Sequence, residues 1–126
     1  QWRNEMIGML KVDYFNPVVK NWTPECQAEE RRQRQSCDYV LYVITPEMTG
    51  VYSVAEVTDD SNKRPAATVF CVLREYGGKR FEDSPWKSLE AVATLVAANG
   101  GTTFLGPGPT GLAAVAQFLN RVAEDA

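Results

Sequence analysis

The amino-acid sequence predicts an α/β fold in which helices cover both faces of a parallel sheet. Helix-like and strand-like segments alternate along the chain, and strict alternation is typical of parallel sheets. Two short apolar runs, at residues 39–45 and 67–73, are rich in β-branched and aromatic residues, as strands buried on both faces are. Start and stop signals for helices flank the segments around these runs. Together these patterns predict a Rossmann or flavodoxin-like arrangement.

The length and composition fit one ordinary globular domain. The 126 residues are 44% hydrophobic and 23% charged, so we expect a single domain over residues 1–126. The formal net charge of -3 argues against a nucleic-acid polymer as partner. No apolar run approaches the roughly 20 residues that cross a bilayer, which argues against a membrane partner.

The residue types exclude several kinds of active site. The chain has no histidine, so neither a Ser/His/Asp nor a Cys/His triad can form. Cys26, Cys37 and Cys71 show no CxxC spacing, which argues against a zinc site and is typical of buried thiols in a reducing cytoplasm. We therefore predict a cytoplasmic protein without a metal or cofactor, whose acid, base or nucleophile is a carboxylate.

The first part of the chain is expected to hold a helix and a short strand. Trp2, Met6 and Leu10 recur at helical spacing. Residues 12–15 form a β-prone run that ends at Asn16-Pro17. Because a doubly wound fold normally begins with a strand, we also expect a further strand and its loop ahead of the opening helix.

The middle of the chain is expected to contain two helices around a central strand. Thr23-Pro24 combines an N-cap with a proline at the first helical position, which predicts a helix over residues 24–37. The run at residues 39–45 is predicted to be the central strand, ended by Pro46. A helix over about residues 53–62 follows.

The remaining segments continue the alternation. We expect a strand, an exposed turn, a helix, a second strand and a last amphipathic helix. In that order they span residues 67–73, 75–81, 84–98, 102–105 and 110–123.

The turn from Thr45 to Glu56 is the strongest candidate for a site. Ligands of parallel sheets bind beyond the carboxyl ends of the strands, and this turn joins such an end to a helix. The helix dipole would keep Glu56 ionised, which suits a nucleophile or a stabiliser of a developing cation. A structural explanation remains open, because Ser53 followed three residues later by Glu56 is also the pattern of a capping box.

Other candidate positions also have competing structural explanations. Asp38 precedes the predicted central strand, where a short acidic residue more often caps a helix or lies exposed. Asp59 and Asp60 follow Glu56 on the predicted helix, where paired aspartates are usually solvated. Tyr52 offers a ring on which a nucleobase can stack, although core packing is the commoner use of aromatic side chains.

Taken together, the motifs resemble the nucleoside 2-deoxyribosyltransferase-like family over almost the whole chain. The resemblance depends on Trp2-Arg3, on residues 14–19 with Trp22, on residues 37–46 and on residues 48–56. The last of these, Met48-Thr49-Gly50-Val51-Tyr52-Ser53-Val54-Ala55-Glu56, is the most specific.

The resemblance implies a role for each candidate residue. Glu56 would be the nucleophile that attacks the sugar C1′, and Asp38 would assist the nucleobase or orient the site. Ser53 would lie under the sugar or phosphate. Asn16, Gly50 and Tyr52 are the other predicted substrate-binding residues.

Two functional hypotheses follow, and a structural α/β subunit without a ligand is a third interpretation that no sequence feature excludes. In the first, the protein is an enzyme that cleaves or transfers the N-glycosidic bond of a (deoxy)nucleoside or nucleotide. In the second, the fold is a nucleotide-binding or regulatory module without turnover, because the family's opening strand is absent and Gly50 stands where the family has an aspartate. We also expect a homo-oligomer, since a site at the edge of a small sheet is shallow and resembling proteins complete theirs with a neighbouring subunit.

Overall fold

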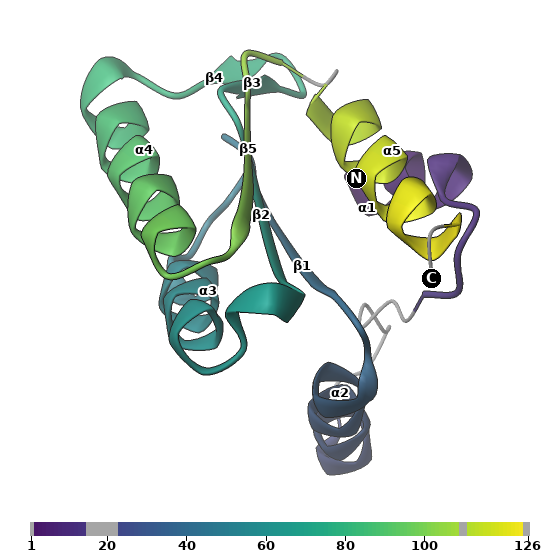
Figure 1. Ribbon diagram of the computed structural model, residues 1–126. Coiled ribbons are helices and arrows are strands. Elements are labelled where there is room, and N and C mark those ends of the chain that lie inside the picture. The colour runs from purple at the N-terminus through teal and green to yellow at the C-terminus, as the bar shows by residue number, and fades with distance from the viewer. Residues whose placement is uncertain (1, 15–22, 109–110, 125–126) are drawn as a thin grey trace.

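The computed structural model describes residues 2–14, 23–108 and 111–124 (Figure 1). Helices and strands alternate along most of this length, with a small hairpin after the second strand. The elements are α1 (Trp2–Met9), α2 (Pro24–Ser36), β1 (Val40–Ile44), α3 (Tyr52–Lys63), the short 3-10 helix η1 (Pro65–Ala67), β2 (Thr68–Leu73), β3 (Glu75–Tyr76), β4 (Lys79–Arg80), α4 (Asp83–Ala98), β5 (Thr102–Gly106) and α5 (Gly111–Glu124).

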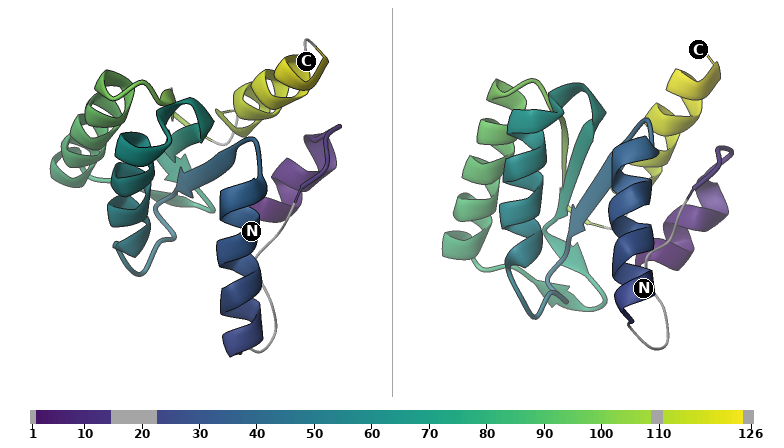
Figure 2. Two further views of the ribbon diagram at one scale, coloured as in Figure 1. Left: turned by 60° about the horizontal axis from the view of Figure 1, so that its bottom comes forward. Right: turned by 90° about the horizontal axis from the view of Figure 1, so that it is seen from below.

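Three parallel strands form the main sheet, in the order β1-β2-β5. Val40 lies opposite Thr68 in the first pair, and Val69 lies opposite Thr102 in the second. Helices α3 and α4 cover one face of the sheet, and α1 and α5 cover the other (Figure 2). The predicted α/β fold, a parallel sheet with helices on both faces, is therefore confirmed.

Strand β2 is buried along its whole length, because successive side chains point to opposite faces and both faces are covered. Phe70 and Val72 pack among side chains of α3 and α4. Val69, Cys71 and Leu73 pack among side chains of α1 and α5. The two halves of the core thus meet at this strand.

The prediction that residues 39–45 form the central strand is wrong. Within the described part of the chain β1 lies at one side of the sheet, and β2 occupies the centre. Both runs are apolar, but in β1 only Tyr42 and Ile44 are buried, whereas all of β2 is buried. Composition therefore identified both strands but not their order.

The strand predicted over residues 12–15 is not formed in its described part, residues 12–14. The backbone just before it is held by α5 instead. The Asn120 side chain accepts a hydrogen bond from the Lys11 N–H (2.8 Å) and donates one to the Met9 carbonyl (3.1 Å). This side chain therefore caps the end of α1 and docks it on α5. Asn16 and the rest of the motif around it lie outside the described residues.

Helix α2 forms as its end signals predict. The Thr23 hydroxyl accepts a hydrogen bond from the Cys26 N–H (3.2 Å), and Pro24 is the first helical residue. Its charged middle is exposed or half-buried, with Arg32 paired to Glu29. None of the helices within the described ranges combines the length and the apolar character that a membrane span requires.

Candidate functional site

The turn between β1 and α3 lies at the carboxyl edge of the sheet and is organised by Thr45. This residue is buried, and its side-chain oxygen accepts a hydrogen bond from the Glu47 N–H (3.2 Å). Its carbonyl accepts another from the Met48 N–H (3.0 Å). The first half of the turn is therefore fixed, whereas Gly50 and the residues on either side of it are exposed.

Helix α3 begins two residues earlier than a capping box requires. Its N-cap is Val51, which has no side chain able to cap, and Ser53 is already the second helical residue. The Val54 N–H bonds the Val51 carbonyl (3.0 Å) and closes the first turn. The capping-box interpretation of Ser53 and Glu56 is therefore wrong, and the first turn of α3 contains no acidic residue.

Ser53 and Glu56 share one flank of α3. Residues three or four apart on a helix lie on the same side, and this flank continues to Asp60. The opposite flank, which includes Thr58 and Asn62, lines an apolar groove of about 740 Å³ between α3 and α4. Glu56, which is half-buried, therefore projects from the side of α3 that faces away from α4.

Asp60 anchors this flank to the sheet. It is 3% exposed, and its carboxylate accepts hydrogen bonds from the Tyr42 hydroxyl of β1 and from Arg64 (Nη2 to Oδ1, 3.1 Å). The expectation that Asp60 is solvated is therefore wrong. Asp59 is solvated as expected, because it pairs with Lys63 on an exposed face of α3.

Asp38 lies far from Glu56. The Tyr42 contact sets Asp60 at the level of the middle of β1. Glu56 is one helical turn nearer the carboxyl edge, about 6 Å, and Val40, where β1 begins, is two strand residues nearer the amino edge, about 7 Å. Asp38 lies in a bend before that start, so its exposed carboxylate and Glu56 are at opposite ends of β1, too far apart to act on the same glycosidic bond.

The other predicted residues of the turn lie near the start of α3. Tyr52 is 76% exposed, so its ring is not part of the core. Gly50 is also exposed, and a Cβ placed on it would meet no atom within 4 Å. The structure therefore brings Gly50, Tyr52, Ser53 and Glu56 together at one edge of the sheet and leaves Asp38 at the other.

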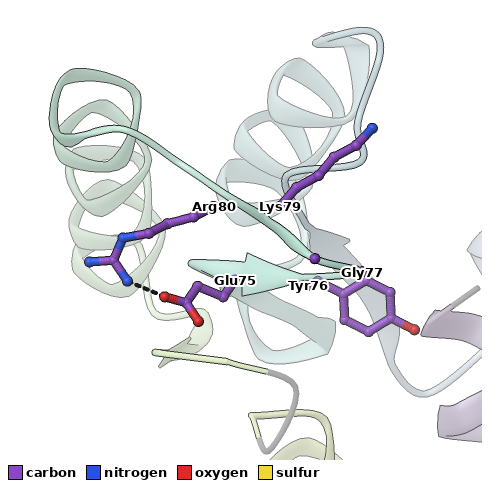
Figure 3. Close-up of a pocket in the computed structure, with 6 residues that line it drawn as sticks. Glu75, Tyr76, Gly77, Lys79 and Arg80 are labelled. Atoms are coloured by element: carbon purple, nitrogen blue, oxygen red, sulfur yellow. Dashed lines mark hydrogen bonds and ion pairs between the residues drawn. The ribbon is translucent and has the colours of Figure 1, made fainter.

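A second group at the carboxyl edge escaped the sequence analysis. Residues 75–80 form a small hairpin that lines a pocket of about 350 Å³, and Tyr76 points from it towards α1 (Figure 3). Its hydroxyl donates a hydrogen bond to Glu5 (2.8 Å), and the residue is 5% exposed. Residues 75–81 are therefore not a uniformly exposed turn. No sequence pattern pairs residues 71 positions apart, so this contact had no local signal.

Burial, the hydrogen bond to Glu5 and the negative charges of Glu5 and Glu47 raise the pKa of Tyr76 to about 12. Burial alone raises the pKa of the Cys71 thiol to about 12. Both groups are therefore neutral in the folded protein at alkaline pH, where an unfolded chain begins to lose these protons.

We expect the free energy of unfolding to fall as the pH rises above about 9. The unfolded chain releases these protons near the ordinary pKa values of 9.0 and 10.0, whereas the folded chain retains them. The stabilisation is complete below those values and is lost as the pH approaches 12. Urea unfolding of wild type and Tyr76→Phe across this range measures it. Tyr76→Phe should lose less stability than the exposed control Tyr14→Phe, and equal losses would contradict the assignment to Tyr76.

Among the described residues, no group of three or more cysteine, aspartate or glutamate side chains is arranged to hold a metal ion. No family model, curated protein or solved structure matches the chain. Only the residues and their placement therefore bear on the function of this protein.

Proposed function

We propose that the protein cleaves or transfers the N-glycosidic bond of a (deoxy)nucleoside or nucleotide, with Glu56 as the nucleophile. The observation that supports this most directly is the position of Glu56. It lies on the flank of α3 that faces away from α4, near a helix start without a side-chain cap, at the carboxyl edge of a parallel sheet. This is the edge at which α/β folds of Rossmann or flavodoxin-like type bind ligands.

Two features of this position suit a nucleophile. Glu56 is the fifth residue of α3, one turn in from the helix start, and the first turn contains no acidic residue that would compete with it for a substrate. A carboxylate that attacks the anomeric carbon needs no histidine or metal.

The proposed reaction has two displacements. A Glu56 carboxylate oxygen forms a bond to the anomeric carbon while the bond to the nucleobase nitrogen breaks and the base takes a proton from an acid or from water. Water or a second nucleobase then attacks the same carbon, loses a proton and releases the carboxylate. Two inversions give net retention, and the choice of acceptor distinguishes a hydrolase from a transferase.

The neighbouring residues supply plausible contacts for such a substrate. Ser53 is on the same flank as Glu56, where its hydroxyl can bond a sugar or phosphate oxygen. The exposed Tyr52 ring offers a stacking surface for a base, and Gly50 leaves open space beside it. The proposal includes Asn16 as a further contact. The resemblance to nucleoside 2-deoxyribosyltransferase-like proteins favours the same chemistry, a homo-oligomeric assembly and a cytoplasmic location.

The separation of Asp38 from Glu56 favours one alternative. If Asp38 cannot protonate the leaving base, the site has a nucleophile without the acid that the resemblance implies, as expected of a nucleotide-binding or regulatory module without turnover. Calorimetry with a panel of nucleosides and nucleotides measures this alternative. Tight binding without base release would support it, and a Glu56-dependent rate would exclude it.

The enzymatic proposal predicts a covalent intermediate. Incubation with deoxynucleosides and their monophosphates should release free base and add one deoxyribosyl or deoxyribosyl-phosphate mass to the protein. Rapid acid quenching, trypsin digestion and fragmentation should place the added mass within residues 35–63, on Glu56 and not on Glu47. Base release with an adduct on any other residue would contradict the assignment.

A further inference from the structure

We propose that Glu47 is a positioning residue, whose carboxylate ties the turn carrying the start of α3 to the hairpin at residues 75–80. The consequence for catalysis rests on the proposed function of Glu56, but the coupling between the two segments does not. Glu47 lies in the turn at the end of β1, and the hairpin follows β2, so the contact joins two loops at one edge of the sheet.

The contact is made at Gly77. A Cβ placed on this residue would lie 2.6 Å from Oε2 of Glu47 and 2.9 Å from its Cδ, so the carboxylate lies directly against the glycine backbone. Gly77 also has a φ of 62°, which other residues rarely adopt. The hairpin therefore presents to Glu47 a surface that only glycine provides.

The two partners differ in how firmly they are held. The hairpin is attached to the rest of the molecule by Arg74, whose carbonyl accepts a hydrogen bond from the Phe81 N–H (2.9 Å). The Arg74 guanidinium pairs with Asp83 (2.6 Å) and lies over the Trp86 ring (5.5 Å). On its other side, Tyr76 fixes the hairpin to α1.

The turn from Thr45 to α3 has fewer contacts of this kind. Its hydrogen bonds to Thr45 fix only Glu47 and Met48, and the residues that follow are exposed up to Tyr52. The Glu47 side chain leaves the fixed half of the turn and lies against the hairpin, so it holds that half of the turn beside the hairpin. The exposed half of the turn starts from there, and Glu47 thereby helps to place the first turn of α3, which carries Ser53.

Gly78 provides a matched control for Gly77. Its φ is 78°, so alanine is strained there as well, but a Cβ on Gly78 would meet no atom within 4 Å. Gly77→Ala and Gly78→Ala therefore impose the same kind of backbone strain, and only the first displaces Glu47.

Hydrogen exchange of three amides measures the coupling: Glu47 and Met48, which are hydrogen-bonded within the turn, and Val54, which is hydrogen-bonded in the first turn of α3. We expect these amides to exchange about tenfold faster in Gly77→Ala than in Gly78→Ala. In a Glu47→Ala background the two glycine variants should exchange alike, because the displaced carboxylate is gone. An equal difference between them in both backgrounds would overturn the proposal.

Glu47→Gln gives a second test that leaves the hairpin backbone unchanged. Burial and the hydrogen bond and charge of Glu5 account for most of the raised pKa of Tyr76, and the Glu47 charge adds the smallest part, so removing that charge should lower the pKa slightly. Carbon-13 labelling of the tyrosine ring followed by NMR titration separates Tyr76 from the other tyrosines. An unchanged titration would overturn the placement of the carboxylate beside the hairpin.

Neither measurement requires turnover, so the two proposals can fail separately. If base release is observed, Glu47→Ala should lower kcat more than it raises KM, because Glu47 acts on the turn that leads into α3 and not on substrate. If the protein releases no base but the exchange cycle shows the coupling, the proposed function fails and the positioning role stands.

Discussion

Glu56→Gln is expected to reduce the rate of base release by about a thousandfold or more, or about 4 kcal/mol of transition-state stabilisation. Glutamine keeps the size of the side chain and both polar atoms, but its amide oxygen is a poor nucleophile and carries no charge to stabilise an oxocarbenium-like transition state. Ground-state contacts to the substrate should change much less. The measurement is the rate of free-base formation at saturating deoxynucleoside.

Glu90→Gln is the matched control. Glu90 lies on α4, and Glu56 faces away from that helix, so the same chemical change should leave the rate within about twofold of wild type. Circular dichroism and urea unfolding establish that both variants are folded. Base release by Glu56→Gln at the wild-type rate would exclude the nucleophile assignment.

Local rules predicted most of the elements correctly because their signals lie within a few residues. Thr23-Pro24 predicts the start of α2, where the threonine oxygen does accept from Cys26. Helix α4 also begins and ends within a residue of its predicted limits, residues 84–98. Such elements depend on capping and periodicity, which a single sequence contains.

The strand order depends on contacts that no local pattern contains. Residues 40–44 and 68–73 are both apolar enough to be central, and only the packing of helices on each face makes β2 the fully buried one. Residues 12–14 have the composition of a strand, but Asn120 holds the chain beside them at the end of α1. Tertiary contacts here override a weak local preference.

The candidate site was predicted in part for the same reason. Glu56 and Ser53 are brought together by helical spacing, which sequence contains. The position of Asp38 relative to Glu56 depends on the level at which α3 packs along β1. The hydrogen bond from Tyr42 to Asp60 sets that level, and no local sequence pattern contains it. The burial of Tyr76 depends on the turn at Gly77 and Gly78. Both glycines have positive φ angles, so the chain reverses there, Tyr76 pairs with Lys79 and its ring points into the core.

Replacing Asp60 by alanine is expected to destabilise the fold by about 3 kcal/mol. The carboxylate is 3% exposed and accepts from both the Tyr42 hydroxyl and Arg64, so its removal breaks two hydrogen bonds, one of them to a charged group, that are made largely out of water. The Arg64 side chain is 30% exposed and can recover some solvation, which keeps the expected loss at the lower end for a broken buried pair. Urea unfolding at neutral pH gives the value.

Asp59→Ala is the control for Asp60→Ala, because it removes an exposed carboxylate from the same helix. The difference in stability between the two variants measures the effect of burial. Asp59 pairs with Lys63 at 3.1 Å, but the two side chains are 55% and 70% exposed, so its loss should cost less than about 0.5 kcal/mol. A cycle with Tyr42→Phe should further show that Asp60→Ala costs less once the hydroxyl is absent, since the hydrogen bond between Tyr42 and Asp60 is then already lost. Equal losses for Asp59→Ala and Asp60→Ala would mean that the buried carboxylate does not anchor α3 to β1, and the separation of Asp38 from Glu56 derived from that anchor would fail with it.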